Sequence, residues 1–389
     1  MNNPVIILGL TANGLAQVRS LASKKIKVVG IYSSNDELGR FSLYCKSFKF
    51  PDVRKHEKLF KKNLLTLAKD LKAKPVLFAE NDIYIDFLSR NREDLEQHFL
   101  FILPDREILE KVMRKDCIKQ LAEMAGLIYP KTFVPTDLAS INKIADEIEY
   151  PCIIKPCNSF SIKFPSKVVV IKSKQELIIF YMQNSHLLNK KTIIQEIIKG
   201  GDENVFECVT YLDNNSTPLA FFTFQKIRQY PPSFGVTSFG VSKTIPAIIK
   251  KSIFFLQRIK FKGFADLEYK WDKEREDFVL LELNPRLTLP TSLAISSGIN
   301  LPYIAYINLV SNGNIKMNNL FQKDGIYWLF FRYDLASFIW KRRNKEISII
   351  SWFRTLSKAR SFAWFDKKDV LPFLKETERL IKISLLKLL

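Results

Sequence analysis

The sequence predicts an α/β protein whose first domain, residues 1–106, is Rossmann-like. Short apolar runs occur at 5–10, 27–32, 76–81 and 101–104. Helical patterns lie between them, at 15–23 and 58–71. Strands that are apolar on both faces are typical of parallel sheets, because helices cover both sides of such sheets. We therefore expect a parallel sheet between two layers of helices.

Length and composition favour a folded, soluble protein. A chain of 389 residues is long enough for two or three domains. Apolar residues make up 47% of it and charged residues 26%, as in ordinary globular proteins and unlike disordered chains. No apolar run reaches the ~18 residues of a membrane-spanning helix, and the N-terminus has no signal-peptide pattern. We expect a cytoplasmic protein.

The cysteine and histidine content and the net charge limit the kinds of site that we expect in this protein. The five cysteines form no CxxC pair, and the three histidines lack the spacing of metal ligands. A disulfide framework, a structural zinc site and a histidine-dependent triad are therefore not expected. The formal net charge of +20 favours anionic partners, which include phosphates, acidic substrates, nucleic acid and an anionic lipid surface.

The first strand-to-helix turn, LTANGLAQ, contains Gly9 and Gly14. It lacks the complete G-x-G-x-x-G spacing that brings the backbone close to a pyrophosphate. We interpret both residues as turn glycines.

A second unit begins near residue 107. Its helical pattern over 107–126 is interrupted at 114–116 and ends at Gly126. Further elements follow in order: strands at 131–135, 152–156 and 167–171, a helix at 174–183, a strand at 192–197, strands within 206–226, a long loop at 228–240, a hairpin of 263–271 and 277–284, and a helix at 301–310.

The segment LLELNPRL, residues 280–287, carries the clearest chemical signal. Residues two apart on a strand share a face, so Glu282 and Asn284 present two oxygen ligands side by side, followed by Arg286. Glu268 on the partner strand adds a second carboxylate. Such a set suits Mg²⁺ with a polyphosphate. The alternative is an edge strand whose Glu and Arg pair in solvent.

Two further positions suggest a nucleotide site. Lys155 interrupts an apolar strand, and a buried lysine needs an anion such as a phosphate oxygen. The alternative is a lysine at the strand end that reaches water. Glu196 and Glu203 flank a glycine turn, where they can accept hydrogen bonds from an adenine amino group and a ribose hydroxyl. Each of them taken alone is an ordinary surface acid.

Taken in this order, these residues resemble the ATP-grasp superfamily over about residues 107–310. The resemblance is to its carboxylate-amine ligase branch, which includes D-aspartate ligases. It implies an ATP-grasp domain at 107–315, with a small lobe at about 107–190 and a large lobe at about 191–315. The implied cofactors are ATP and Mg²⁺, or Mn²⁺ in its place. The implied roles are phosphate binding by Lys115 and Lys155, adenine and ribose binding by Glu196 and Glu203, metal binding by Glu268, Glu282 and Asn284, and contact with the transferred phosphoryl group by Arg286.

The chain departs from this family in one loop. Many members have a glycine-rich phosphate-covering loop after the strand lysine, but CNSFSIKFPSK at 157–167 has no glycine. Ser159, Ser161 and Lys167 would then supply side-chain donors in place of backbone N–H groups. Similar loops occur in the D-aspartate ligase branch.

The resemblance also suggests a substrate contact. Lys226, in FQKIRQYPP, resembles the lysine that positions an acidic substrate, and Arg228 is the weaker candidate. The two alternate at the entrance of the 228–240 loop, which we expect to cover the site. The alternative is that both cations lie at the edge of the loop and are hydrated by solvent.

Residues 316–389 form a basic, aromatic extension. From Leu320 onward it holds 15 Lys/Arg against 7 Asp/Glu and four of the five tryptophans. We expect the extension to pack on the ATP-grasp domain. The alternative is peripheral contact with a membrane through 325–343, where aromatics precede a basic end.

The resulting hypothesis is an ATP-dependent ligase that joins a carboxylate to an amine through an acyl phosphate. The partners are then small molecules, with an amino acid among the candidates. Two other classes remain open, a catalytically silent nucleotide-binding module and a basic nucleic-acid-binding protein. The nucleic-acid class is disfavoured because no such motif occurs and the acidic cleft would repel phosphates unless a metal is bound.

Overall fold

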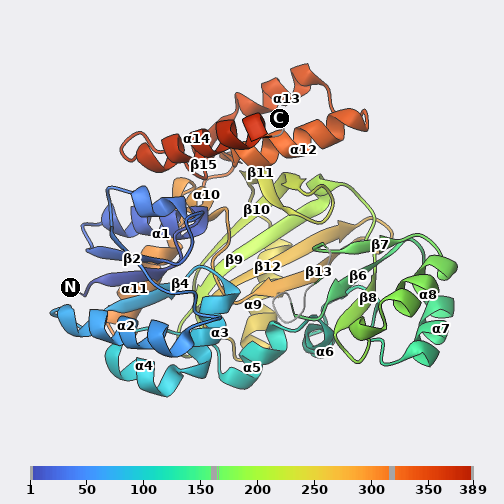
Figure 1. Ribbon diagram of the computed structural model, residues 1–389, viewed down its shortest axis with the longest axis horizontal. Helices are drawn as coiled ribbons and strands as arrows, with labels where there is room; N and C mark the ends of the chain where they lie inside the picture. The colour runs from blue at the N-terminus through green and yellow to red at the C-terminus, as the bar shows by residue number, and fades with distance from the viewer. Residues whose placement is uncertain (1–2, 159–163, 165, 315–319, 387–389) are drawn as a thin grey trace.

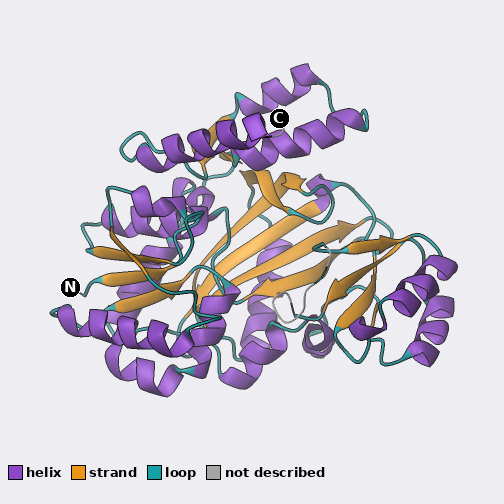
Figure 2. Cartoon of the chain, in the orientation of Figure 1, coloured by secondary structure: helices purple, strands orange, loops and turns teal. Residues whose placement is uncertain are grey.

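The computed structural model describes residues 3–158, 164, 166–314 and 320–386, with side chains described up to residue 382. A large, mostly antiparallel sheet crosses the centre, with the N-terminal domain on one side and a small lobe on the other (Figure 1). The C-terminal helices lie along the top of this view. Figure 2 shows that most helices lie at the periphery of the molecule, around the strands. The fold is a mixed α/β fold.

The N-terminal domain contains a four-stranded parallel sheet of order β3-β2-β1-β4. Its strands are β1 (Val5–Leu8), β2 (Val28–Tyr32), β3 (Lys46–Lys49) and β4 (Val76–Ala79). Its helices are α1 (Ala12–Ala22), α2 (Glu57–Asp70), α3 (Asp82–Arg90) and α4 (Arg92–His98). Alternate residues of β1 enter two different cores, one with α1 and one with α2 and α3. The expected parallel sheet covered on both faces is therefore confirmed.

Two details of this sheet differ from the prediction. The run at 101–104 forms no strand, and only Leu100 makes an isolated bridge to Val76. β3 was not expected, because its sequence KSFK is polar and its side chains are exposed or half-buried at the sheet edge.

Carboxylates of the protein itself fill the first strand-to-helix turn. Glu80 accepts the N–H groups of Thr11 at 3.0 Å and Gly14 at 2.9 Å, and Glu37 accepts that of Leu10 at 2.8 Å. These N–H groups are the donors that would bind a pyrophosphate in a dinucleotide site. Since they are already satisfied, the turn is structural, in agreement with its incomplete motif.

The small lobe is built on an antiparallel sheet of order β5-β8-β6-β7. Its strands are β5 (Thr132–Phe133), β6 (Cys152–Pro156), β7 (Val169–Ile171) and β8 (Thr192–Glu196). The associated helices are α5 (Arg106–Val112), α6 (Lys115–Met124), α7 (Leu138–Glu147) and α8 (Lys174–Gln183). β8 pairs with both β5 and β6. β8 therefore belongs to this sheet, although it lies beyond residue 190.

The central sheet has seven strands in the order β13-β12-β9-β10-β11-β14-β15. Their bounds are β9 (Val205–Leu212), β10 (Pro218–Tyr230), β11 (Val236–Ser242), β12 (Gly263–Asp272), β13 (Asp277–Asn284), β14 (Tyr327–Leu329) and β15 (Ala359–Phe362). α9 (Pro246–Arg258) packs on one face of this sheet. α10 (Thr291–Ser296) and α11 (Leu301–Val310) share a core with its other face and with α1.

The expected hairpin at 263–284 is formed by β12 and β13, and it contains one irregularity. Glu268 pairs with Glu282, whereas the next residue, Tyr269, pairs with Leu280. Leu281 is therefore an extra residue, and it forms a β-bulge. Leu280 and Leu283 both lie in the core beside α9, although three positions separate them.

The prediction of a long loop at 228–240 is wrong. β10 continues to Tyr230 and β11 begins at Val236, which leaves only a tight turn at 231–235. The proline pair lies within this turn, and the following residues pair with β10 across the hairpin, with register shifts on either side of Arg228. This segment is therefore mostly sheet and offers no long flexible cover.

The C-terminal segment extends the central sheet. β14 pairs with β11, and β15 pairs with β14. The helices are α12 (Phe331–Arg343), α13 (Ile349–Leu356) and α14 (Leu371–Leu386). The buried Asp369 binds Arg19 of the N-terminal domain at 2.9 Å, so the segment contacts that domain as well as the sheet. Among the described residues, no helix combines the length and apolarity needed to span a membrane.

Candidate active site

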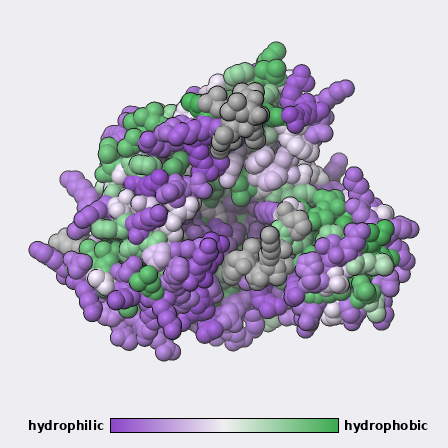
Figure 3. Space-filling model, in the orientation of Figure 1, coloured by the Kyte–Doolittle hydropathy of each residue, from purple (hydrophilic) through white to green (hydrophobic). Residues whose placement is uncertain are grey.

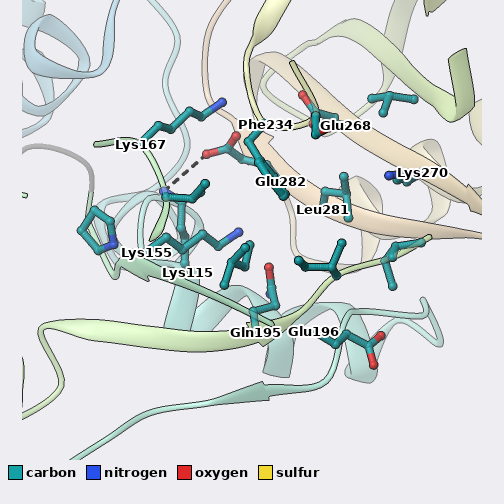
Figure 4. Close-up of a pocket in the computed structure, with 17 residues that line it drawn as sticks. Lys115, Lys155, Lys167, Gln195, Glu196, Phe234, Glu268, Lys270, Leu281 and Glu282 are labelled. Atoms are coloured by element: carbon teal, nitrogen blue, oxygen red, sulfur yellow. Dashed lines mark ion pairs between the residues drawn. The ribbon is translucent and has the colours of Figure 1, made fainter. Parts of the chain in front are cut away.

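A cleft lies between the small lobe and the central sheet, and the molecule is hollowed there (Figure 3). Lysines and glutamates from several elements face this cleft, as Figure 4 shows. Its lining residues are Lys115, Ile153, Lys155, Pro156, Lys167, Val168, Gln195, Glu196, Ile197, Ile198, Val205, Ser233, Phe234, Glu268, Lys270, Leu281 and Glu282.

Three glutamates stand in a row across three neighbouring strands. The strand register places Glu207 of β9 opposite Glu268 of β12, and Glu268 opposite Glu282 of β13. Opposite residues of antiparallel strands project from the same face. Because their neighbours along the strands enter the core beside α9, the three carboxylates face the cleft side of the sheet.

Three lysines of the small lobe face the outer end of this row. Lys115, at the start of α6, lies 3.4 Å from Glu282. Burial opposes ionisation of Glu282, but the charges of Lys115, Lys167 and Lys155 outweigh it and lower its pKa to about 2. Burial and the neighbouring Lys115 lower the pKa of Lys155 to about 8. Such a concentration of positive charge is suited to a polyphosphate.

Arg286 connects this site to the N-terminal domain. Its guanidinium donates to both carboxylate oxygens of Asp82, at 2.6 and 3.1 Å. Asn284 donates weakly to Asp266 at 3.4 Å. Asp82, Asn284, Lys115 and Glu282 line a second, smaller hollow beside the cleft. Arg286 thus lies at the junction of three parts of the chain.

The donor set fits a magnesium ion. Glu268 and Glu282 are opposite partners on the hairpin, and Asn284 lies two residues from Glu282. Carboxylate and amide oxygens are the hard ligands that Mg²⁺ takes. Beside them, burial and the carboxylates Glu207 and Glu268 raise the pKa of Asp266 well above its usual range, and Asp266 is hydrogen-bonded to Glu207.

The two proposed nucleoside contacts lie in different environments. Glu196 lines the cleft, together with the backbone of Ile197 and Ile198 just beyond it. Its carboxylate pairs with Arg275 at 2.9 Å. Glu203 is exposed and is not among the lining residues; its side chain lies over Gly201. The structure therefore brings Glu196 to the cleft and leaves Glu203 at its margin.

The structure corrects the expectations for Lys226 and Arg228. Lys226 is fully buried, and its Nζ lies 2.6 Å from Glu268 and 3.0 Å from Glu207. Arg228 is buried against Asp334 of α12. Neither lines the cleft. Both cations are neutralised within the protein, so they are not available to hold a substrate carboxylate in this arrangement.

The phosphate-covering loop is only partly described. Ser159 and Ser161 lie outside the described residues. Lys167, at the end of the loop, lines the cleft. A hydrogen bond from the N–H of Lys115 to the carbonyl of Cys157, at 2.9 Å, connects α6 to the start of the loop.

Several lining residues were missed in the sequence. Lys270 shares a face with Glu268, because the two are two apart on β12, and this alternation would have revealed it. Asp82 is the first residue of α3 and lies three positions after the end of the parallel strand β4, and the carboxyl end of such a strand is a typical place for functional residues. Phe234 and Leu281 carried no comparable signal, since they face the cleft through a turn and a bulge.

Comparisons with known proteins agree with this geometry. The chain is 25% identical over 317 residues to a D-aspartate ligase of Enterococcus faecium. The aligned region covers 76% of this chain and 74% of the relative. No protein-family model matches the chain.

Solved structures show the same fold. The biotin carboxylase domain of a Hydrogenobacter thermophilus 2-oxoglutarate carboxylase, solved with MgADP and bicarbonate, matches 84% of this chain and 74% of its own, with a TM-score of 0.64 and 14% identity. An L-amino acid ligase from Bacillus licheniformis matches 81% and 78%, with a TM-score of 0.60 and 14% identity. The sequence similarity to a ligase, the shared fold and the site geometry agree, and the chain resembles the ATP-dependent carboxylate-amine ligases of the ATP-grasp superfamily.

Proposed function

We propose that the protein uses ATP to activate a small-molecule carboxylate as an acyl phosphate and then joins it to an amine. The main support for this proposal is that three lysines and two glutamates line the same cleft: Lys115, Lys155, Lys167, Glu268 and Glu282. This arrangement offers cations for a polyphosphate and hard oxygen ligands for a metal. The D-aspartate ligase relative supports an amino acid as one substrate.

The proposed chemistry requires no covalent enzyme intermediate. A substrate carboxylate oxygen attacks the γ-phosphorus of ATP, which gives an acyl phosphate and ADP. The amine then attacks the acyl carbon, loses a proton and expels phosphate, leaving an amide bond. Positioning and electrostatic stabilisation are the main contributions that a protein makes to phosphoryl transfer.

Each group of residues has a distinct part in this proposal. Lys115, Lys155 and Lys167 would bind the phosphates, and the apolar Leu281 and Ile153 would contact the adenine with Glu196 and the backbone beyond it. Arg286, held by Asp82, would face the transferred phosphoryl group. Glu268, Glu282 and Asn284 would hold Mg²⁺, or Mn²⁺ in its place, and the bound metal would neutralise charge on the phosphates. Glu203 would reach the ribose only from the cleft margin.

The direct test is release of ADP from ATP and Mg²⁺ in the presence of paired amino acids and carboxylates. D-aspartate with a panel of amines and carboxylates is the first set, followed by L-amino acids. We expect ADP release that depends on both substrates, with an amide product detected by mass spectrometry. ADP release that no substrate pair stimulates would contradict the ligase proposal.

The catalytically silent module is the second candidate. It would bind ATP in the same cleft without turnover, so calorimetry of ATP binding separates it from a protein that lacks the nucleotide site. We also propose that the chain divides into units at about residues 106 and 315, which limited proteolysis would examine.

A further inference from the structure

The C-terminal helices α12 and α13 form a hairpin that projects from the top of the molecule in Figure 1. The connection between them, 344–348, is short, and Ser348 caps α13 through Ser351. α12 packs on β10 and β11 of the central sheet, whereas the proposed metal ligands lie on β12 and β13. No residue of α12 or α13 is among the described residues that line the proposed catalytic cleft.

One face of this hairpin is fixed to the protein. Trp352 stacks on Phe338 with ring centroids 4.3 Å apart, and its indole N–H donates to Asp334 at 2.8 Å. Asp334 in turn binds Arg228 of the central sheet. The expectation that the extension packs on the rest of the protein thus describes the inner face.

The outer face carries large apolar side chains that the described part of the chain leaves exposed. Ile350 is 73% exposed and Phe353 60% exposed. Neighbouring positions on both helices add exposed side chains at Ile339, Trp340 and Ile349. Figure 3 shows apolar residues gathered at this upper end of the molecule. Five such side chains on one projecting hairpin form a patch of the kind that marks an interaction surface.

The segment that carries this patch is strongly basic. The exposed basic residues of residues 331–360 are Arg342, Arg343, Lys345, Arg354, Lys358 and Arg360. Glu346 is the single exposed acid in the same range, and the other acid, Asp334, is buried. Exposed apolar side chains and a surplus of exposed cations therefore occur together on this segment.

We propose that this hairpin binds the surface of an anionic lipid membrane. Apolar side chains that enter the boundary between headgroups and acyl chains, with cations at headgroup level, are the pattern of interfacial amphipathic helices. The charge argues against the other occupants. A second copy would bring the same six cations against these six, and a nucleic acid would leave the aliphatic side chains of Ile349 and Ile350 without a favourable contact.

The proposed contact lies on the surface and does not cross the bilayer. α12 and α13 are far shorter than the ~20 residues that a spanning helix needs. Lys341 and Asp202 pair at 3.1 Å, and Asp202 also accepts from the N–H of Ser233, a residue that lines the cleft. Two successive contacts, Lys341 with Asp202 and Asp202 with Ser233, would thus link a membrane bound at the hairpin to the cleft.

Flotation with vesicles tests the proposal on the full chain. We expect the protein to float with phosphatidylcholine vesicles that contain phosphatidylglycerol, to stay behind with pure phosphatidylcholine, and to be released by salt. Ile350→Asp with Phe353→Asp should reduce flotation at least about tenfold, and so should Arg342→Glu with Arg343→Glu. These residues are exposed, so thermal unfolding should remain as in the parent protein.

Matched variants at the start of α2 and just before it, on a different part of the surface, serve as controls. Leu59→Asp places a charge on an apolar position that is 50% exposed, and Lys55→Glu with Lys58→Glu changes the net charge by the same amount as the arginine pair. Neither should change flotation. Absence of flotation with anionic vesicles, equal loss in the α2 variants, or binding of short duplex DNA or a second copy through the hairpin without vesicle binding would each overturn the proposal.

Discussion

The Arg228 guanidinium donates to both carboxylate oxygens of Asp334, at 2.7 and 3.1 Å, and neither side chain is accessible to solvent. Arg228 belongs to the central sheet and Asp334 to α12. Arg228 also stacks over Phe239, 4.5 Å from the ring centroid. This pair connects the C-terminal segment to the ATP-grasp sheet, and a variant can remove its charge without changing its shape.

We expect Asp334→Asn to lower the free energy of unfolding by about 3–5 kcal/mol, because it leaves the buried Arg228 charge without a counter-ion. Chemical denaturation measures this change. Glu110→Gln, which breaks the exposed Arg106–Glu110 pair, is the control and should cost less than about 1 kcal/mol. A similar small cost for both variants would show that the buried pair contributes little.

Glu282→Gln tests the metal site. The amide keeps the size of the side chain but removes the charge that a divalent cation needs, so ATP turnover should fall at least about 100-fold, which corresponds to about 3 kcal/mol. Glu274→Gln, in the exposed turn of the same hairpin, should leave turnover unchanged. Full activity of a folded Glu282→Gln protein would remove Glu282 from the site.

Lys155 should make ATP binding depend on pH. Its pKa of about 8 means that the free protein loses this cation as the pH rises above 8. A bound phosphate favours the protonated lysine, so ATP affinity should fall by up to about tenfold per pH unit above this value. Calorimetry across this range measures the effect. Lys155→Met should bind ATP more weakly and without this dependence; a matching slope in the variant would assign it to another group.

Lys226→Met should act on stability and not on substrate affinity. Burial raises the pKa of Glu207 and of Asp266, and Lys226 opposes both shifts. Without the lysine these acids become harder to ionise, so folding should cost more as the pH rises above their usual range. We expect a loss of about 3–5 kcal/mol at neutral pH that becomes smaller toward pH 5. A pH-independent loss would indicate a packing defect.

The strands could be predicted from the sequence where burial on both faces leaves an uninterrupted apolar run, as at 5–8 and 76–79. The hairpin of β12 and β13 was also predictable, because alternation and a charged turn mark its limits. The pairing of β10 with β11 was not. Its charged residues suggest an exposed loop, since their counter-ions lie elsewhere in the chain, and Asp334 is more than a hundred residues from Arg228.

The same physical reason separates the predicted residues that line the cleft from those that do not. Lys155 and Glu282 interrupt otherwise apolar strands, and this local signal was enough to place them in the cleft. Lys226 interrupts its strand in the same way, but neighbouring strands of the sheet supply its two carboxylates. Sequence shows that a charge is buried; only the strand register shows whether the protein or a ligand neutralises it.

The extra residue in β13 has a consequence for how the cleft obtains its two chemical surfaces. In a regular strand, Leu281 would point away from Glu282, toward α9. Because of the bulge, the side chains of Leu281 and Glu282 both line the cleft, although the two residues are adjacent in sequence. An apolar wall for a flat ring and an oxygen ligand for a metal thus share one strand. Deleting Leu281 would restore a regular ladder in which Glu282 still faces the cleft and Leu280 still faces α9, so the cleft would lose this aliphatic side chain and keep the oxygen ligand.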